Sequence, residues 1–290
     1  MTVVERPILL CVTLLSYIRR LVLGRHAIGV VYESQNGTLI SGTGDMFVGG
    51  NLGFRGRYET DMLSSLMALV GPESRVLVLG SHVGALAIPL AKKVRELVAY
   101  EANPETYRFL RYNIALNNAD NITAYNLAVG DRAGKIEFLT SKVNSGGSGR
   151  RFDQPNVLQL ERYKPIEVEM VRLSEHNKNP NFDFVLMDIE GSEYFALQGM
   201  KEILEHCNYL QFEYLPTTLT GSGLSDQDCV AALGERFSEI RIQGTDIVAR
   251  RPDFLSFFQR LRAEGQRVDL LAAAVPTAVR QPAQSAMASV

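Results

Sequence analysis

Short apolar runs alternate with longer amphipathic stretches along most of the chain. Runs of about four to eight apolar residues that end at glycine or at an acidic residue are typical of buried strands. They occur at 75–80, 96–102, 122–130, 182–191 and 208–216. Stretches with helical spacing follow the runs, at 83–94, 104–118, 192–207 and 225–237. This alternation predicts an α/β fold with a doubly wound, mostly parallel sheet.

The pattern changes near the C-terminus. "SEIRIQ" and "DIVARR" are separated only by Gly244-Thr245, and so short a link joins antiparallel neighbours. Five parallel strands closed by an antiparallel edge hairpin form a seven-stranded, Rossmann-like sheet, the arrangement of class I S-adenosylmethionine-dependent methyltransferases. A dinucleotide-binding Rossmann domain continues instead in parallel strand–helix–strand units.

The N-terminal region reads as an extension of this domain. Residues 6–23 predict an amphipathic helix that covers the domain or packs on a second subunit of a homo-oligomer. Its apolar core at 8–15 is too short to span a bilayer, which takes about 20 residues, and no cleavage site follows it. Stable membrane insertion is therefore not expected, and attachment to a membrane surface is the alternative. A hairpin at 29–42, turning near Asn36-Gly37, comes next.

These patterns divide the chain into three parts. An N-terminal helix and hairpin occupy 1–57, and the sheet domain, which opens with a helix at 58–70, occupies 58–263. The segment 264–290 is rich in Ala, Gln, Pro and Ser, and we expect it to have little fixed structure.

Composition limits the partners. A net charge of −2 and a pI of about 6.1 give no basic footprint for nucleic acid. The three cysteines have no paired spacing, so neither a disulfide framework nor a zinc site is expected. We therefore expect a cytoplasmic protein that acts on a small molecule.

The strand at 75–80 ends in the turn Gly80-Ser81-His82-Val83-Gly84. This turn lacks the middle glycine that brings backbone against a pyrophosphate, so it suits a ligand without phosphate, or simply connects a strand to a helix. Glu101 follows Gly80 by 21 residues, at the end of the next strand. An acid at that position accepts hydrogen bonds from ribose hydroxyls.

The chain resembles the FkbM-type methyltransferases from Tyr58 to Pro216. The resemblance rests on "VLVLGSHVGALAIPLAKK", "LVAYEANPETYRFLRYNIALNN", "FDFVLMDIEGSEYFALQGM" and "YLQFEYLP", with D-x-E-G-x-E at 188–193 as the most specific element. It implies S-adenosylmethionine as cofactor and O-methylation of a sugar or polyketide-type hydroxyl. By analogy, the residues that contact the cofactor are Gly80, Ser81, His82, Gly84, Glu101 and Asp188, and Asn126, Ala128 and Val129 lie near adenine.

The chain departs from the family pattern at five positions. The family usually has Asp, Asn, Pro, Asp and Lys where this chain has Val78, His82, Ala102, Ser174 and Leu186. The change at Val78 removes an anchor for the methionine ammonium. His82 takes over part of that role or is an ordinary polar residue of the turn.

The acidic residues at 188–193 are the candidates for the acid–base chemistry of methyl transfer. Methyl transfer needs reactants held in line and a group that accepts the hydroxyl proton. We expect Asp188 to be that base and Glu190 its partner, while Glu193 caps the following helix. His176 and Glu213 are alternative bases, and His206 is expected to be a charge partner at a helix C-terminus.

Several alternatives remain open. Asp188 and Glu190 are also potential Mg²⁺ ligands, although no metal is expected. The glycine-rich segments 49–57 and 144–151 either fold over the site and select the acceptor or are plain solvent loops. The favoured function is that of an S-adenosylmethionine-dependent O-methyltransferase. A degenerate, non-catalytic protein that binds a nucleoside or a partner, and a nucleotide-dependent oxidoreductase, are the other candidates.

Overall fold

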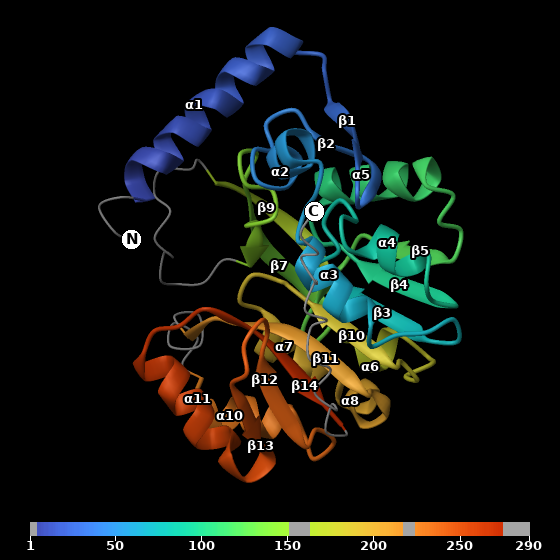
Figure 1. Ribbon diagram of the computed structural model, residues 1–290, viewed down its shortest axis with the longest axis vertical. Helices are drawn as coiled ribbons and strands as arrows, with labels where there is room; N and C mark the ends of the chain where they lie inside the picture. Colours follow the sequence, from blue (N-terminus) through green and yellow to red (C-terminus); the bar gives the residue numbers. More distant parts are fainter. Residues whose placement is uncertain (1–4, 151–162, 217–223, 275–290) are drawn as a thin grey trace, which may run out of the picture.

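The computed structural model describes residues 5–150, 163–216 and 224–274. A large sheet forms its centre, built from β3 Arg75–Leu79, β4 Glu96–Tyr100, β5 Ile122–Tyr125, β10 Phe184–Met187, β11 Tyr209–Tyr214, β12 Glu239–Ile242, β13 Val248–Arg250 and β14 Val268–Ala273. The strand order is β13-β12-β14-β11-β10-β3-β4-β5 (Figure 1).

Five of these strands, β3, β4, β5, β10 and β11, pair in parallel. The central strands β3 and β10 are buried throughout, as expected for parallel strands covered on both faces. The predicted α/β fold with a mostly parallel, doubly wound sheet is therefore confirmed.

The C-terminal edge is antiparallel but differs in detail from the prediction. β12 and β13 pair antiparallel, as their short link predicts. However, β14 lies between β12 and β11, antiparallel to both, so the sheet has eight strands rather than seven. The prediction of little fixed structure from 264 onward is wrong for 268–273. The overall composition of that segment masked a short apolar run, which β11 and β12 bury; 275–290 lie outside the described residues.

A smaller sheet lies beside the carboxyl ends of β4 and β5. It contains β6 Ala128–Val129, β7 Gly134–Thr140, β8 Gly149–Arg150 and β9 Lys164–Val171, in the order β6-β9-β7-β8. The strand predicted at 122–130 is therefore two strands in two sheets. Asn126 lies at the break, where its amide donates to the carbonyl oxygens of Glu101 (2.8 Å) and Ala102 (3.1 Å).

Helices cover both faces of the large sheet. One face packs against α6 Leu173–His176, α7 Glu193–Gly199, α8 Lys201–His206, α10 Asp226–Ala232 and α11 Phe254–Ala263, which follows the short 3₁₀ helix η1 Arg251–Asp253. The other face packs against α2 Val48–Arg55, α3 Thr60–Met67, α4 Ala87–Ala91 and α5 Pro104–Leu116.

Local sequence explains several helix ends. Asn103 caps α5 by accepting a hydrogen bond from the Glu105 N–H, and Pro104 occupies the first turn. The helix predicted at 192–207 is interrupted at Met200, which separates α7 from α8. The helix predicted at 83–94 is confined to α4 because a turn occupies its first residues.

The N-terminal extension consists of α1 Glu5–Leu23 and the hairpin β1 Gly29–Ser34 and β2 Gly37–Gly42. The register pairs Ser34 with Gly37, as the predicted turn requires. The Asn36 side chain is buried and donates to the carbonyl oxygens of Tyr58 and Ala85, both at 2.8 Å, so the hairpin is fixed to the sheet domain. Among the described helices, none combines the length and the apolar character needed to cross a membrane.

Candidate active site

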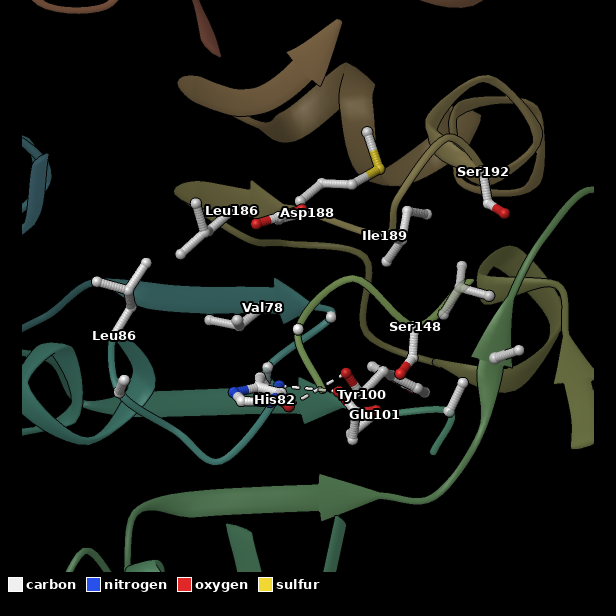
Figure 2. A pocket seen from close by; sticks show the side chains of 18 of the residues that line it. Val78, His82, Leu86, Tyr100, Glu101, Ser148, Leu186, Asp188, Ile189 and Ser192 are labelled. Carbon is white, nitrogen blue, oxygen red and sulfur yellow. Dashed lines mark hydrogen bonds between the residues drawn. The ribbon is translucent and has the colours of Figure 1, made fainter. Parts of the chain in front are cut away.

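A cavity opens at the carboxyl ends of β3, β4 and β10, between the large sheet and the smaller one (Figure 2). Its lining includes the turn after β3, the end of β4, the second sheet and the end of β10. Ligands of open α/β sheets bind at this edge of the sheet. The predicted site residues that line the cavity are Gly80, Ser81, His82, Glu101, Ala128, Val129 and Asp188.

The turn after β3 approaches the end of β10 very closely. Gly80 has a φ of 77°, and a Cβ added there would lie 1.7 Å from the Asp188 carbonyl oxygen. The backbone N–H groups of Gly80 and Ser81 both donate to the Tyr100 carbonyl oxygen at 3.0 Å. Gly84 also has a positive φ, and a Cβ there would meet Leu110 at 2.9 Å. Gly84 therefore shapes the turn and is not part of the described lining.

Glu101 is 7% exposed and holds the turn in place. One carboxylate oxygen accepts the His82 N–H and the other accepts the Asn103 N–H, each at 2.8 Å. Burial raises the pKa of Glu101 to about 7, and the two backbone hydrogen bonds oppose that shift. Each carboxylate oxygen accepts one of these bonds and keeps a lone pair for a further donor such as a ribose hydroxyl.

His82 connects the turn to the glycine-rich loop that precedes β8. It has a φ of 49°, and its Nε2 lies 2.7 Å from the Ser145 hydroxyl. Burial lowers the pKa of His82, so the ring is neutral at neutral pH. Ser145, Gly146 and Ser148 line the cavity.

The two glycine-rich segments therefore have different structures. Of the two alternatives left open for 144–151, a plain solvent loop does not fit, because this segment lines the cavity as far as Arg150; a role in selecting the acceptor stays a prediction. The prediction of a loop is wrong for 49–57, because α2 occupies most of that segment and packs against Tyr32 of β1.

The part of the cavity next to β6 and β7 of the smaller sheet is apolar, whereas Arg150 of β8 brings a charged group from the same sheet. Its lining residues are Leu127, Ala128, Val129, Ile136 and Phe138. The amide of Asn126 is bonded to backbone carbonyls, and Asn126 is not among the described lining residues. An apolar slot next to Glu101 suits a flat, uncharged ring.

The opposite end carries several acidic side chains. Asp188 is exposed to the cavity and surrounded by protein on its other sides; burial, and secondarily Asp269, raises its pKa to about 6. Glu59 and Asp269 also line this end, and burial raises the pKa of both carboxyls. Burial likewise raises the pKa of the Tyr58 hydroxyl. We call Glu59, Asp188 and Asp269 the acidic end.

Gln211 completes that end and was missed by the sequence analysis. It is 1% exposed, lines the cavity, and neither amide atom has a hydrogen-bond partner within the described structure. Its one signal in the sequence is that it is polar within the buried strand β11. The register places Gln211 beside Leu186, which is itself beside Val78.

Glu190 and Glu213 lie behind Asp188, outside the described lining. Arg267 donates to Glu213 and lies 3.7 Å from a Glu190 carboxylate oxygen. Burial is the main reason that the pKa of Glu190 is raised to about 8 and that of Glu213 to about 7, and Asp188 adds to both shifts. Glu190 also has a φ of 51°, a strained conformation for a side-chain-bearing residue.

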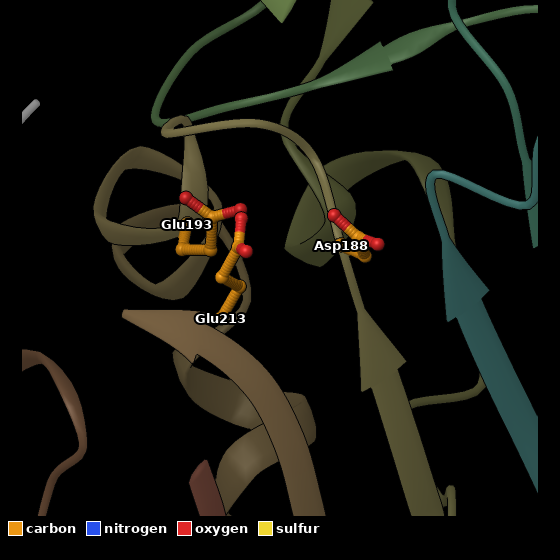
Figure 3. A group of neighbouring side chains, drawn as sticks. All are labelled: Asp188, Glu193 and Glu213. Atoms are coloured by element: carbon orange, nitrogen blue, oxygen red, sulfur yellow. The ribbon is translucent and has the colours of Figure 1, made fainter. Parts of the chain in front are cut away.

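Asp188, Glu193 and Glu213 form a carboxylate cluster (Figure 3). One oxygen from each lies within 4.8 Å of the others, and such oxygens suit a divalent cation. However, Glu193 accepts the Ile189 N–H at 3.0 Å, and Glu213 is paired with Arg267. Glu193 thus stabilises the backbone before α7, in whose first turn it lies. The capping of that helix through its dipole stays a prediction, and so does the expectation of no metal.

The two remaining histidines singled out from the sequence, His176 and His206, lie in other parts of the fold. His176, at the end of α6, has its Nδ1 2.8 Å from the Tyr100 hydroxyl and packs edge-on against Tyr125. It is not among the described lining residues of the cavity. His206 is exposed at the last residue of α8. Of the predicted bases, Asp188 alone belongs to the described lining.

Comparisons with known proteins agree with this architecture. Residues 79–268, more than half of the chain, match the family described as the methyltransferase FkbM domain. The 2-O-methyltransferase NoeI of Sinorhizobium fredii is 26% identical over 160 residues. That match covers 49% of this chain and 64% of the relative.

Two solved structures illustrate the range of structural neighbours. A methyltransferase FkbM from Methylobacillus flagellatus is 16% identical, with a TM-score of 0.42, over 70% of this chain and 44% of that chain. TYW2 from M. jannaschii, solved with AdoMet, is 12% identical, with a TM-score of 0.43, over 85% of each chain. On the extent of the family match, this chain belongs to the FkbM methyltransferase domain family.

Proposed function

We propose that this protein is an S-adenosylmethionine-dependent O-methyltransferase whose acceptor is a hydroxyl of a sugar, polyketide or similar small molecule. The observation that carries the proposal is the charge of the cavity. Among the described lining residues, four carboxyls, those of Glu59, Glu101, Asp188 and Asp269, stand against one guanidinium, that of Arg150. A cationic ligand complements such a lining, whereas a dinucleotide brings two phosphate charges into it.

The residues present fit the cofactor. The apolar slot at the smaller sheet accommodates adenine, and the free lone pairs of Glu101 accept ribose hydroxyls. The acidic end then faces the sulfonium and ammonium groups. When bound, the cofactor supplies an electrophilic methyl group with a good leaving group already attached.

Gln211 offers a replacement for the acid that the family usually has at position 78. The two positions occupy the same row of the sheet, separated by one strand, or about 10 Å. The Gln211 amide oxygen has no partner in the described structure, and an ammonium group donates readily to such an oxygen. We infer that Gln211 orients the methionine end of the cofactor.

Asp188 is the proposed general base. Its carboxylate faces the cavity, and its pKa of about 6 leaves it mostly ionised at neutral pH and still basic enough to accept a hydroxyl proton. Arg267 lowers the pKa of Asp188, which keeps the ionised form accessible despite burial. The name of the relative NoeI, a 2-O-methyltransferase, supports oxygen as the methylated atom.

Titration calorimetry with S-adenosylmethionine, S-adenosylhomocysteine and NAD tests the cofactor assignment. The two sulfur nucleosides are expected to bind and NAD is not. Binding of NAD alone would support the oxidoreductase alternative. Binding of the nucleosides without radiolabelled methyl transfer to a broad panel of hydroxylated acceptors would favour the non-catalytic alternative.

A further inference from the structure

Helix α1 is attached to the body through its polar face. The Ser16 hydroxyl is buried and donates to the Gly44 carbonyl oxygen at 2.7 Å. Arg19 donates to the Tyr32 hydroxyl and to the Asp45 carbonyl oxygen, and its guanidinium lies 5.6 Å from the centroid of the Tyr32 ring. These contacts orient the helix along the outside of the molecule (Figure 1).

The apolar face of α1 consequently points into solvent. The exposed fractions are 57% for Leu14, 52% for Leu15, 59% for Tyr17, 46% for Ile18, 62% for Leu21 and 80% for Val22. These positions recur at helical spacing and form one stripe without a charged residue. We call them the apolar stripe. An ordinary surface helix has the reverse arrangement, and a stripe of this kind marks a contact surface.

The segment that carries the stripe is strongly basic. Residues 6–32 contain four arginines and no acidic residue, in a chain whose net charge is −2. A symmetric dimer through α1 would bring two such segments together, because an isologous interface places the same patch on both sides. The charge therefore disfavours a second copy of this chain and favours an anionic surface.

A second cavity, of about 380 Å³, lies directly beside the stripe. Tyr17 and Leu21 of the stripe line it. Four cationic side chains also line it, those of Arg20, Arg25, Arg108 and Lys142.

Two acids belong to the same lining, Asp45 and Glu105. The Asp45 carboxylate accepts the N–H groups of Phe47, Val48 and Gly49, and the four cationic side chains outnumber the two acids of the described lining. The N-terminus of α5 also opens here, and its dipole favours negative charge.

We propose that α1 and this basic cavity bind the surface of an anionic phospholipid bilayer. The helix lies in the plane of the interface, with the apolar stripe at the boundary of the acyl chains. Arg20, Arg25, Arg108 and Lys142 then lie at the level of the lipid phosphates. This attachment is peripheral and agrees with the finding that no described helix suits a membrane span.

Co-sedimentation of the full chain with vesicles tests the proposal. Vesicles of phosphatidylcholine with about one-third phosphatidylglycerol should retain the protein, and pure phosphatidylcholine vesicles should retain at least about tenfold less. Raising the salt to about 1 M should weaken the retention, because it screens charges beyond a few ångströms.

Variants distinguish binding through the apolar stripe from non-specific hydrophobic adsorption. The triple change Leu14→Gln, Ile18→Gln, Leu21→Gln should reduce partitioning to anionic vesicles by at least about tenfold. The double change Ile247→Gln, Val248→Gln removes exposed apolar side chains from the β12–β13 edge and should have no effect. The double change Arg25→Glu, Arg108→Glu should abolish the preference for anionic lipid.

Three results would overturn the proposal. The first is that anionic vesicles do not retain the wild type. The second is that the stripe variant and the control variant lose vesicle binding equally. The third is that the wild type forms a dimer, the stripe variant is monomeric, and neither protein binds vesicles. The last result would assign the stripe to a second copy of the chain. Circular dichroism and S-adenosylhomocysteine binding, unchanged in every variant, verify that the sheet domain is intact.

Discussion

The two ends of the candidate active site are built on opposite principles. The end next to the smaller sheet offers hydrocarbon from Leu127, Val129, Ile136 and Phe138, with no ionisable group among these residues. The acidic end gathers Glu59, Asp188 and Asp269, whose carboxyl pKa values are raised mainly by burial. One end offers an apolar surface, and the other gathers carboxyls whose ionised form burial makes unfavourable.

This difference indicates where substitutions act. Apolar contacts are non-directional and tolerate small changes. A carboxylate that accepts a proton, or an amide without a partner, acts at one atom. The most selective effects on function are therefore expected at the acidic end and at Glu101, which lies between the two ends.

The largest effect is expected for Asp188→Asn. Asparagine keeps the shape of the side chain but removes its basicity, so methyl transfer should fall by about 10² to 10⁴-fold. Affinity for S-adenosylhomocysteine, which lacks the sulfonium charge, should stay within about threefold. Transfer of a radiolabelled methyl group and calorimetry measure the two quantities, with the exposed Asp120→Asn as the matched control.

The pH profile sharpens this assignment. Because the pKa of Asp188 is raised to about 6, the wild-type kcat/KM should increase with pH through that value as the carboxylate ionises. Loss of binding together with turnover in Asp188→Asn would make Asp188 a cofactor or structural residue. Loss of neither would transfer the role of base to Glu213 or His176.

A smaller effect is expected for Glu101→Ala. The change removes the acceptor for two backbone N–H groups and the proposed acceptor for ribose hydroxyls, so S-adenosylhomocysteine affinity should fall by about tenfold or more. Calorimetry measures it, with the exposed Glu73→Ala as the control. Unchanged affinity in a folded variant would remove Glu101 from the cofactor site.

The smallest effect on binding, and an opposite effect on stability, is expected for Gln211→Leu. Replacing a buried amide without partners by a hydrocarbon should stabilise the free protein by about 1–3 kcal/mol, or several degrees in Tm. S-adenosylmethionine affinity should fall about threefold to tenfold. A lower Tm with unchanged affinity would show that Gln211 serves packing and does not hold the cofactor.

Much of the site follows from short-range patterns in the sequence. A buried strand, a glycine turn and an acid 21 residues later predict that Gly80 and Glu101 meet, because the ends of neighbouring parallel strands share one edge. The same reasoning places Asp188 with them, since β10 pairs with β3. These predictions require only that the residue at the end of each strand is known.

The other residues of the site come together through contacts between segments that are far apart in the sequence. Asp269 and Arg267 reach the site only because β14 inserts between β11 and β12, and the composition of that segment gives no local sign of it. The register across β3, β10 and β11 decides that Gln211 shares a row with Val78.

The sequence by itself determined the order of elements, the glycine turn and the acids at the strand ends, because local periodicity and backbone sterics act within about 20 residues. It also determined that α1 is amphipathic. Only the tertiary structure decided which side of α1 meets the body, since that depends on acceptors at Gly44 and Asp45 on a distant loop. The same holds for the charge of the cavity, which is the sum of side chains brought together from β4, β10, β14 and the start of α3.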